Sequence, residues 1–287
     1  MEKENLGRRQ VLAVIGGALA LGGLQACGDD SNDSANDQQP EQPPAGPQVA
    51  DYPYDQHIAA TYQLDAAKVR ELAYQAYYNG GCCHGAFSGL IDHLSATVGQ
   101  PFNLIPRTFG QFGAGGIAGY GSICGSILGG ILIINSIVSK ADVRTNMLTD
   151  LMRWYEREAF PKYVPVTIAP NEAGKTTLDF TNVAGLQVVP GSHLCHASVS
   201  TWCAANAVST KSADKLARCS RLTADVAGKV AEMLNAYLST GTYAGPAAID
   251  DTSAGCLGCH GPATTFEPVA SGMSCTSCHS DKTTGHP

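Results

Sequence analysis

Residues 246–287 limit how this chain can fold more than any other segment. They are rich in Gly, Ser, Thr, Ala and Pro and have few large apolar side chains, so they cannot build a hydrophobic core alone. They also carry one motif twice, as Cys256-Leu-Gly-Cys259-His260 and Cys275-Thr-Ser-Cys278-His279. Cys-x-x-Cys-His is the signature of covalent c-type haem attachment. We therefore expect a largely irregular tail that orders around two haem c groups.

The spacing of the motif follows from the chemistry of attachment. Its two thiols can each add to a haem vinyl group, and the adjacent imidazole, His260 or His279, then reaches the iron as the proximal ligand. A single Cys-x-x-Cys would fit half a zinc site or a redox dithiol equally well. Two copies, each followed directly by His, favour haem. Since only residues 261–274 separate the motifs, the two haems should be close neighbours.

Each haem iron also needs a distal ligand or keeps an open position. Histidine is the better candidate, because Met273 is the only methionine close to a haem motif. We favour His196, which lies in a Cys/His-rich run, and then His286, which is close to its own haem. His84 and His193 stay open as alternatives.

Residues 1–27 have the pattern of an export signal. Gly7-Arg8-Arg9-Gln10-Val11-Leu12 and an uncharged run precede Leu24-Gln25-Ala26-Cys27, which predicts a twin-arginine leader ending at a lipobox. An ordinary signal peptide with an incidental cysteine is the alternative. Residues 28–49 are acidic and Pro-rich, as in a disordered tether. We expect a mature protein on the periplasmic side of the envelope, attached to a membrane by lipid on Cys27.

Six of the eleven cysteines belong neither to the lipobox nor to the haem motifs. In an oxidising compartment they could form three disulfides. The twin-arginine route exports folded chains, and this favours an iron-sulfur cluster assembled before export. Both alternatives stay open for Cys82, Cys83, Cys124, Cys195, Cys203 and Cys219. On one continuous helix Cys195 and Cys203 would be about 12 Å apart, too far to serve one small cluster.

Hydrophobic periodicity predicts a mainly α-helical domain over residues 50–245. We expect helices over 63–79, 83–98, 123–138, 142–158, 192–208 and 212–240, with Gly80-Gly81 ending the first. Residues 164–168 and 177–180 are short strands or extended loops. No charged residue occurs over 108–139. We interpret its apolar part as a buried helix, and a membrane span is the alternative.

Charge narrows the range of partners. Charged residues make up 15% of the chain and the net charge is −7, so a nucleic-acid partner is not expected. A soluble redox partner should be basic, or should dock through a local patch near an exposed haem edge.

Several runs together resemble the split-Soret cytochrome c family over essentially residues 60–280. They are residues 80–87 (Gly-Gly-Cys-Cys-His-Gly-Ala-Phe), 124–129 (Cys-Gly-Ser-Ile-Leu-Gly), 194–203 (Leu-Cys-His-Ala-Ser-Val-Ser-Thr-Trp-Cys), Arg218-Cys219 and the two haem motifs. The non-haem part is also similar to the family named for a Gly-Cys-Ala-x-x-Gly pattern. Cys83 replaces the Ala and Ala86 the last Gly, so that local motif transfers weakly.

The resemblance implies a homodimer with two stacked bis-histidine haems per subunit, one axial ligand donated across the dimer, and an iron-sulfur centre. It points to an electron carrier between redox partner proteins and not to an enzyme. Two other functions stay open, a small multihaem reductase with a vacant iron position and a disulfide-stabilised redox sensor.

Overall fold

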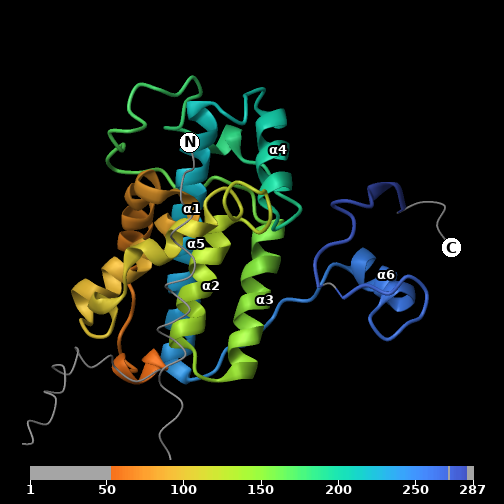
Figure 1. Cartoon of the computed structure of the whole chain (residues 1–287), viewed down its shortest axis with the longest axis horizontal. Coiled ribbons are helices and arrows are strands. Elements are labelled where there is room, and N and C mark those ends of the chain that lie inside the picture. The colour runs from red at the N-terminus through yellow and green to blue at the C-terminus, as the bar shows by residue number, and fades with distance from the viewer. Residues whose placement is uncertain (1–52, 271, 283–287) are drawn as a thin grey trace, which may run out of the picture. The chain divides into compact units, whose positions relative to one another are not determined.

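The computed structural model describes residues 53–270 and 272–282 (Figure 1). The predicted leader, Cys27, the acidic tether and His286 lie outside these residues. Within them the chain is mainly α-helical and contains no β-strand, only two isolated β-bridges. The predicted fold class is therefore confirmed.

The described residues form six α-helices: the first five cover the six ranges that the periodicity predicts, and the sixth, in the tail, was not predicted. They are α1 (Ala66–Thr97), α2 (Gly125–Ile137), α3 (Ala141–Arg157), α4 (Cys195–Ala205), α5 (Ala213–Thr240) and α6 (Asp251–His260). Short 3-10 helices occur between and after them: η1 (Tyr54–His57), η2 (Phe102–Leu104), η3 (Arg107–Gly113), η4 (Val183–Leu186) and η5 (Ser280–Lys282).

Polar caps determine where the long helices begin and end. The Asp65 carboxylate accepts the amides of Ala67 and Lys68 at 2.9 and 3.0 Å and starts α1. Ser212 caps α5 in the same way, and α5 ends at Gly241, whose φ of 66° is left-handed.

The two predicted helices over 63–79 and 83–98 are the two halves of α1. Gly81 interrupts the helix with φ 81° and ψ −171°, a conformation that residues with a side chain rarely adopt. The chain folds back there, so that the backbone amide of Asp65 donates to His93 Nε2 at 3.1 Å. This turn positions Cys82 directly after the bend.

The main core lies between α1, α2, α3 and α5. Helix α5 packs along α1, and α2 lies against both, with α3 beside α2 (Figure 1). Leu90, Ile134, Leu151 and Val230 are among its completely buried side chains. Among the described residues, no helix combines the length and the apolar character that a bilayer crossing requires.

Of the two alternatives expected for residues 164–168 and 177–180, the structure has loops. At Thr177 and Leu178 the Asp214 carboxylate accepts the backbone amides at 2.7 and 2.8 Å, so these amides are not available to a sheet. One expectation about the tail differs from the structure. The first haem motif, in a tail expected to be largely irregular, lies on the regular helix α6.

Candidate functional site

Four of the six extra cysteines line one small cavity inside the helical domain. Cys82 follows the bend in α1, Cys124 caps α2, Cys195 is the first residue of α4, and Cys219 lies on α5. The remaining lining residues are Ser126, Tyr155, Ser198, Val199, Arg218 and Leu222. Cysteines that are far apart in the sequence thus meet because four helices converge.

Backbone contacts hold these cysteines in place. An isolated bridge between Ile123 and Leu194 sets the start of α2 beside the start of α4, and the Cys195 amide donates to Ser122 O at 2.6 Å. Gly125 is needed for the close approach of α1 to α2, because a Cβ there would collide with the sulfur of Cys82. The Gly115 amide donates to the same sulfur.

The other two cysteines face elsewhere. Cys83 lies under η3, where a Cβ on Gly113 would be 2.7 Å from its sulfur. Cys203 lies at the far end of α4 in a second apolar cluster with Trp202 and Phe180. Because Cys195 and Cys203 occupy one helix, the structure does not bring them together. Pairing all six cysteines in disulfides would require Cys83 and Cys203 to leave these positions.

None of the ten cysteines of the described residues forms a disulfide. No three Cys, His, Asp or Glu side chains in that range converge on one metal-ion position. The donor set of the cavity nevertheless fits an iron centre. It offers four soft sulfur ligands in a largely buried space, together with a buried cation.

The cavity is a poor environment for isolated thiolates. Burial, and after it the neighbouring Cys124 and Cys219, raises the pKa of Cys195 to about 12. The same causes raise the pKa of Cys82 well above its ordinary value. Thiolates would therefore need a bound cation to become the stable form.

Two buried hydroxyls connect opposite walls of the cavity. Tyr155 OH and Ser198 Oγ lie 2.8 Å apart, and Arg218 Nη2 donates to Ser198 Oγ at 2.7 Å. Tyr155 also bonds to the side chain of Cys124, and burial raises its pKa. One polar chain thus joins α3, α4 and α5 around the sulfur atoms.

The two haem motifs lie close to each other. Cys256, Cys259 and His260 occupy the second half of α6, and the amide of Cys275 donates to Ser253 Oγ on the same helix at 2.8 Å. The side chain of Ser253 is completely buried. This contact fixes the start of the second motif beside the helix that carries the first.

The residues around these motifs fit a haem. Cys259 and Cys278 are exposed and accessible for attachment, whereas structural thiols are normally buried. Phe266 and Val269 are also exposed, and the Phe266 ring centroid lies 5.4 Å from that of His260. A porphyrin would cover such apolar side chains, which the tail itself leaves open to water.

The distal candidates have different surroundings. His193 is mostly buried, and its Nδ1 lies 2.9 Å from Glu156 Oε1. His84 is buried, with Nδ1 3.1 Å from the carbonyl of Arg107. His196 is exposed on α4, and His286 lies outside the described residues.

One feature of His193 was not foreseen from the sequence. It lines a pocket together with Met152 of α3 and with Met273, two residues before the second haem motif. The pairing with Glu156 could not be predicted, because the two residues lie on separate segments of the chain.

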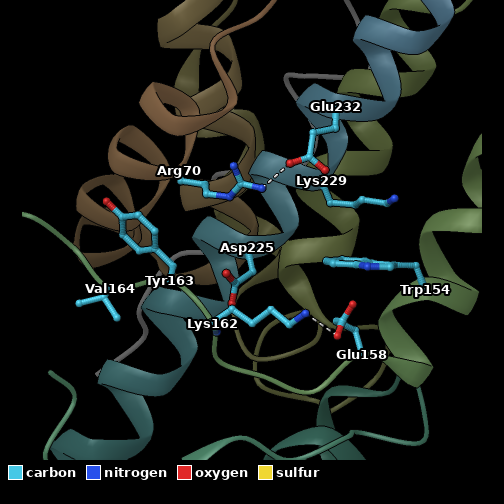
Figure 2. A pocket seen from close by; sticks show the side chains of 9 residues that line it. All are labelled: Arg70, Trp154, Glu158, Lys162, Tyr163, Val164, Asp225, Lys229 and Glu232. Atoms are coloured by element: carbon cyan, nitrogen blue, oxygen red, sulfur yellow. Dashed lines mark hydrogen bonds and ion pairs between the residues drawn. The ribbon is translucent and has the colours of Figure 1, made fainter. Parts of the chain in front are cut away.

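Another pocket lies away from the cysteines. Its volume is about 410 Å³, and Figure 2 shows charged side chains from α1, α5 and the end of α3 around it. Arg70 and Glu232 form one ion pair, Lys162 and Glu158 another, and Asp225 lies at the base. None of its lining residues is a Cys or His, so it is not a candidate redox centre.

Comparisons with known proteins agree with this geometry. Residues 78–233 match the family model described as "Putative redox-active protein (C_GCAxxG_C_C)". The chain is 30% identical over 284 residues to the split-Soret cytochrome c of Desulfovibrio desulfuricans, which covers 96% of this chain and 95% of the relative. The chain belongs to the split-Soret cytochrome c family. The resemblance found in the sequence is thereby confirmed.

A solved structure supports the same assignment. It is that of the split-Soret cytochrome c from Desulfovibrio desulfuricans ATCC 27774, described as having a novel iron centre. Its TM-score to this chain is 0.65 at 29% identity, and the match covers 79% of this chain and 94% of the solved one. Both relatives are c-type cytochromes, and membership of their family supports a redox role for this chain.

Proposed function

We propose that this chain is a periplasmic electron-transfer protein with two haem c groups and one iron-sulfur centre. The observation that carries the proposal is the convergence of four cysteines from α1, α2, α4 and α5 on one enclosed cavity, in a chain that also has two haem motifs. A carrier needs closely spaced one-electron centres and no substrate pocket beside them.

Two haems are supported by the two complete motifs. Cys256 and Cys259 hold one haem and Cys275 and Cys278 the other. His260 and His279 are the proximal ligands. When bound, each haem supplies an iron that cycles between the ferric and ferrous states. The contact from Cys275 N to Ser253 Oγ keeps the two attachment sites side by side.

For the distal ligand of the second haem we propose His193 ahead of His196. A ligating histidine usually donates its other ring N–H to a carboxylate, which fixes the ring orientation. The 2.9 Å contact from His193 Nδ1 to Glu156 provides this and leaves Nε2 for a metal. Its pocket also includes Met273, next to the second motif. His84, His196 and His286 remain candidates for the other haem.

For the iron-sulfur centre we propose Cys82, Cys124, Cys195 and Cys219 as the ligands. Cys83 and Cys203 are then structural cysteines in apolar surroundings. This assignment excludes the three-disulfide alternative, since the four thiols would be bound to iron.

We further propose that the chain works as a homodimer tethered to a membrane. Residues 104–120, whose Gly115 amide donates to the Cys82 sulfur, support a self-association surface through their exposed apolar side chains. These side chains are Leu104, Phe109, Phe112, Ile117 and Tyr120. The leader and Cys27 support export by the twin-arginine route and lipid anchoring. The net charge of −7 favours a basic redox partner.

The test is cofactor analysis of protein purified without oxygen from a host that matures c-type cytochromes. We expect two haems per chain by intact mass, and non-haem iron with acid-labile sulfide. Cys124→Ser should abolish the non-haem iron, whereas the matched variant Cys203→Ser should keep it. Wild type without non-haem iron would refute the centre, and ready carbon monoxide binding by the ferrous dimer would favour the reductase alternative.

A further inference from the structure

Arg218 is a buried cation with an unusual environment. Its side chain is only 1% exposed and lines the cysteine cavity. Nη1 donates to the Cys219 sulfur at 3.8 Å and Nη2 to Ser198 Oγ at 2.7 Å, while Nε has no hydrogen-bond partner. The guanidinium carbon lies 6.0 Å from the centre of the Trp202 ring. These contacts orient the guanidinium, but none of them supplies a negative charge.

The next buried arginine on the same helix shows what is missing. Arg221 is also completely buried, and it forms an ion pair with Glu172 at 2.6 Å. Within the described residues no carboxylate oxygen lies within 4.0 Å of Arg218. An uncompensated buried charge is strongly unfavourable, so proteins pair such charges or place them beside a charged cofactor.

The cavity can supply the counter-charge in only one of its possible states. Free thiols and disulfides are neutral, whereas an iron-sulfur centre with four thiolate ligands is anionic, because its thiolates and inorganic sulfides together carry more negative charge than the iron neutralises. Arg218 therefore matches an anionic occupant of the cavity and does not match a disulfide core. The N–H···S contact with Cys219 places the guanidinium beside this sulfur.

We propose that Arg218 is the positioning residue that neutralises the iron centre and raises its midpoint potential. The inference rests on the proposed iron-sulfur centre. One-electron reduction adds a negative charge to the centre, and a fixed cation beside a ligand sulfur stabilises that reduced form more than the oxidised one. Ser198 and Trp202 keep the guanidinium facing the cavity, so the effect comes from a preorganised charge.

The experiment compares Arg218→Met and Arg218→Lys in the full-length dihaem protein, with Lys229→Met as control. Lys229 lies on the same helix α5 and lines the pocket of Figure 2, not the cysteine cavity. Redox titration followed by paramagnetic resonance gives the potential of the non-haem centre, and iron and sulfide analysis gives its occupancy. At a fixed ambient potential, Arg218→Met should lower the reduced-to-oxidised ratio about tenfold or more, equivalent to about 59 mV for one electron.

Each outcome decides the proposal. The proposal is supported if Arg218→Met lowers the reduced-to-oxidised ratio of the centre and Arg218→Lys largely restores it. It is also supported if Arg218→Met loses the non-haem iron and Arg218→Lys keeps it. Full occupancy with an unchanged potential in Arg218→Met overturns it, and so does a Lys variant no better than the Met variant. Wild type without non-haem iron would instead refute the proposed centre itself.

A second measurement needs no variant and holds even if the variants fail to fold. Protein labelled with nitrogen-15 arginine should show nitrogen coupling to the reduced centre by pulsed paramagnetic resonance. Arg218 is the one arginine among the residues that line the cavity. Absence of that coupling in wild type with a full iron centre would overturn the inference.

Discussion

Asp225→Asn should make the protein more stable at alkaline pH, although it removes a charged group. Asp225 is 6% exposed and lies at the base of the pocket in Figure 2. Burial raises the pKa of its carboxyl from 3.8 to about 7, despite a 2.8 Å hydrogen bond from the Lys162 amide and the positive charge of Arg70. At pH 8 the folded protein therefore keeps a buried carboxylate that would be better solvated in the unfolded chain.

The sign and size follow from linkage. Between about pH 4 and 7 the folded state holds a proton that the unfolded state has lost, so stability falls as the pH rises. The stability that protonated Asp225 contributes is complete below the pKa of the unfolded chain and is lost once the pH exceeds about 7. At 1.36 kcal/mol per pH unit, the loss between pH 5 and pH 8 is about 3 kcal/mol. The isosteric Asn keeps an oxygen for the Lys162 amide and has no such pH dependence.

The assay is urea unfolding of the dihaem protein at pH 5, 6, 7 and 8, followed by far-ultraviolet circular dichroism. The Asn variant should gain about 3 kcal/mol relative to wild type from pH 5 to pH 8. Asp214→Asn is the control on the same helix. Hydrogen bonds from Thr177 and Leu178 outweigh burial and lower the pKa of Asp214, so its stabilisation is instead lost as the pH falls through that lowered value. An Asp225→Asn curve parallel to wild type would refute the reasoning.

Three further predictions concern the helical domain. Arg221→Met should destabilise the fold by about 3–5 kcal/mol in urea unfolding, because it leaves the buried Glu172 carboxylate unpaired. Gly81→Ala should cost about 1–3 kcal/mol, since it forces a residue with a side chain to φ 81°, and it should lower the non-haem iron content by displacing Cys82. Cys82→Ser should abolish that iron in chemical analysis, whereas Cys83→Ser should leave it unchanged.

Much of the helical fold could be predicted because its determinants are local. For α5, the apolar spacing over residues 212–240 and the two capping residues, Ser212 and Gly241, all lie within one stretch of the sequence. The helix begins and ends within a residue of the expected positions. The bend in α1 was also predictable, since Gly80-Gly81 interrupts an otherwise continuous helical pattern. Such signals need no knowledge of tertiary contacts.

The cysteine cavity could be predicted only as a set of candidates. Six cysteines were named from the sequence, but which of them meet depends on how four helices converge. Cys82 and Cys83 are neighbours in the sequence, yet one faces the cavity and the other lies under Gly113. The pairing of His193 with Glu156 depends on the same long-range packing.

The positions of the four cavity cysteines also bear on the order of assembly. Because they come from α1, α2, α4 and α5, an iron centre among them would be enclosed only when the helical domain has folded. The haem motifs, in contrast, stay accessible in the folded chain, since Cys259 and Cys278 are exposed and can react after folding. A chain that acquires one cofactor while folding and the other afterwards would need export in the folded state. The twin-arginine leader predicted at residues 7–12 offers that route.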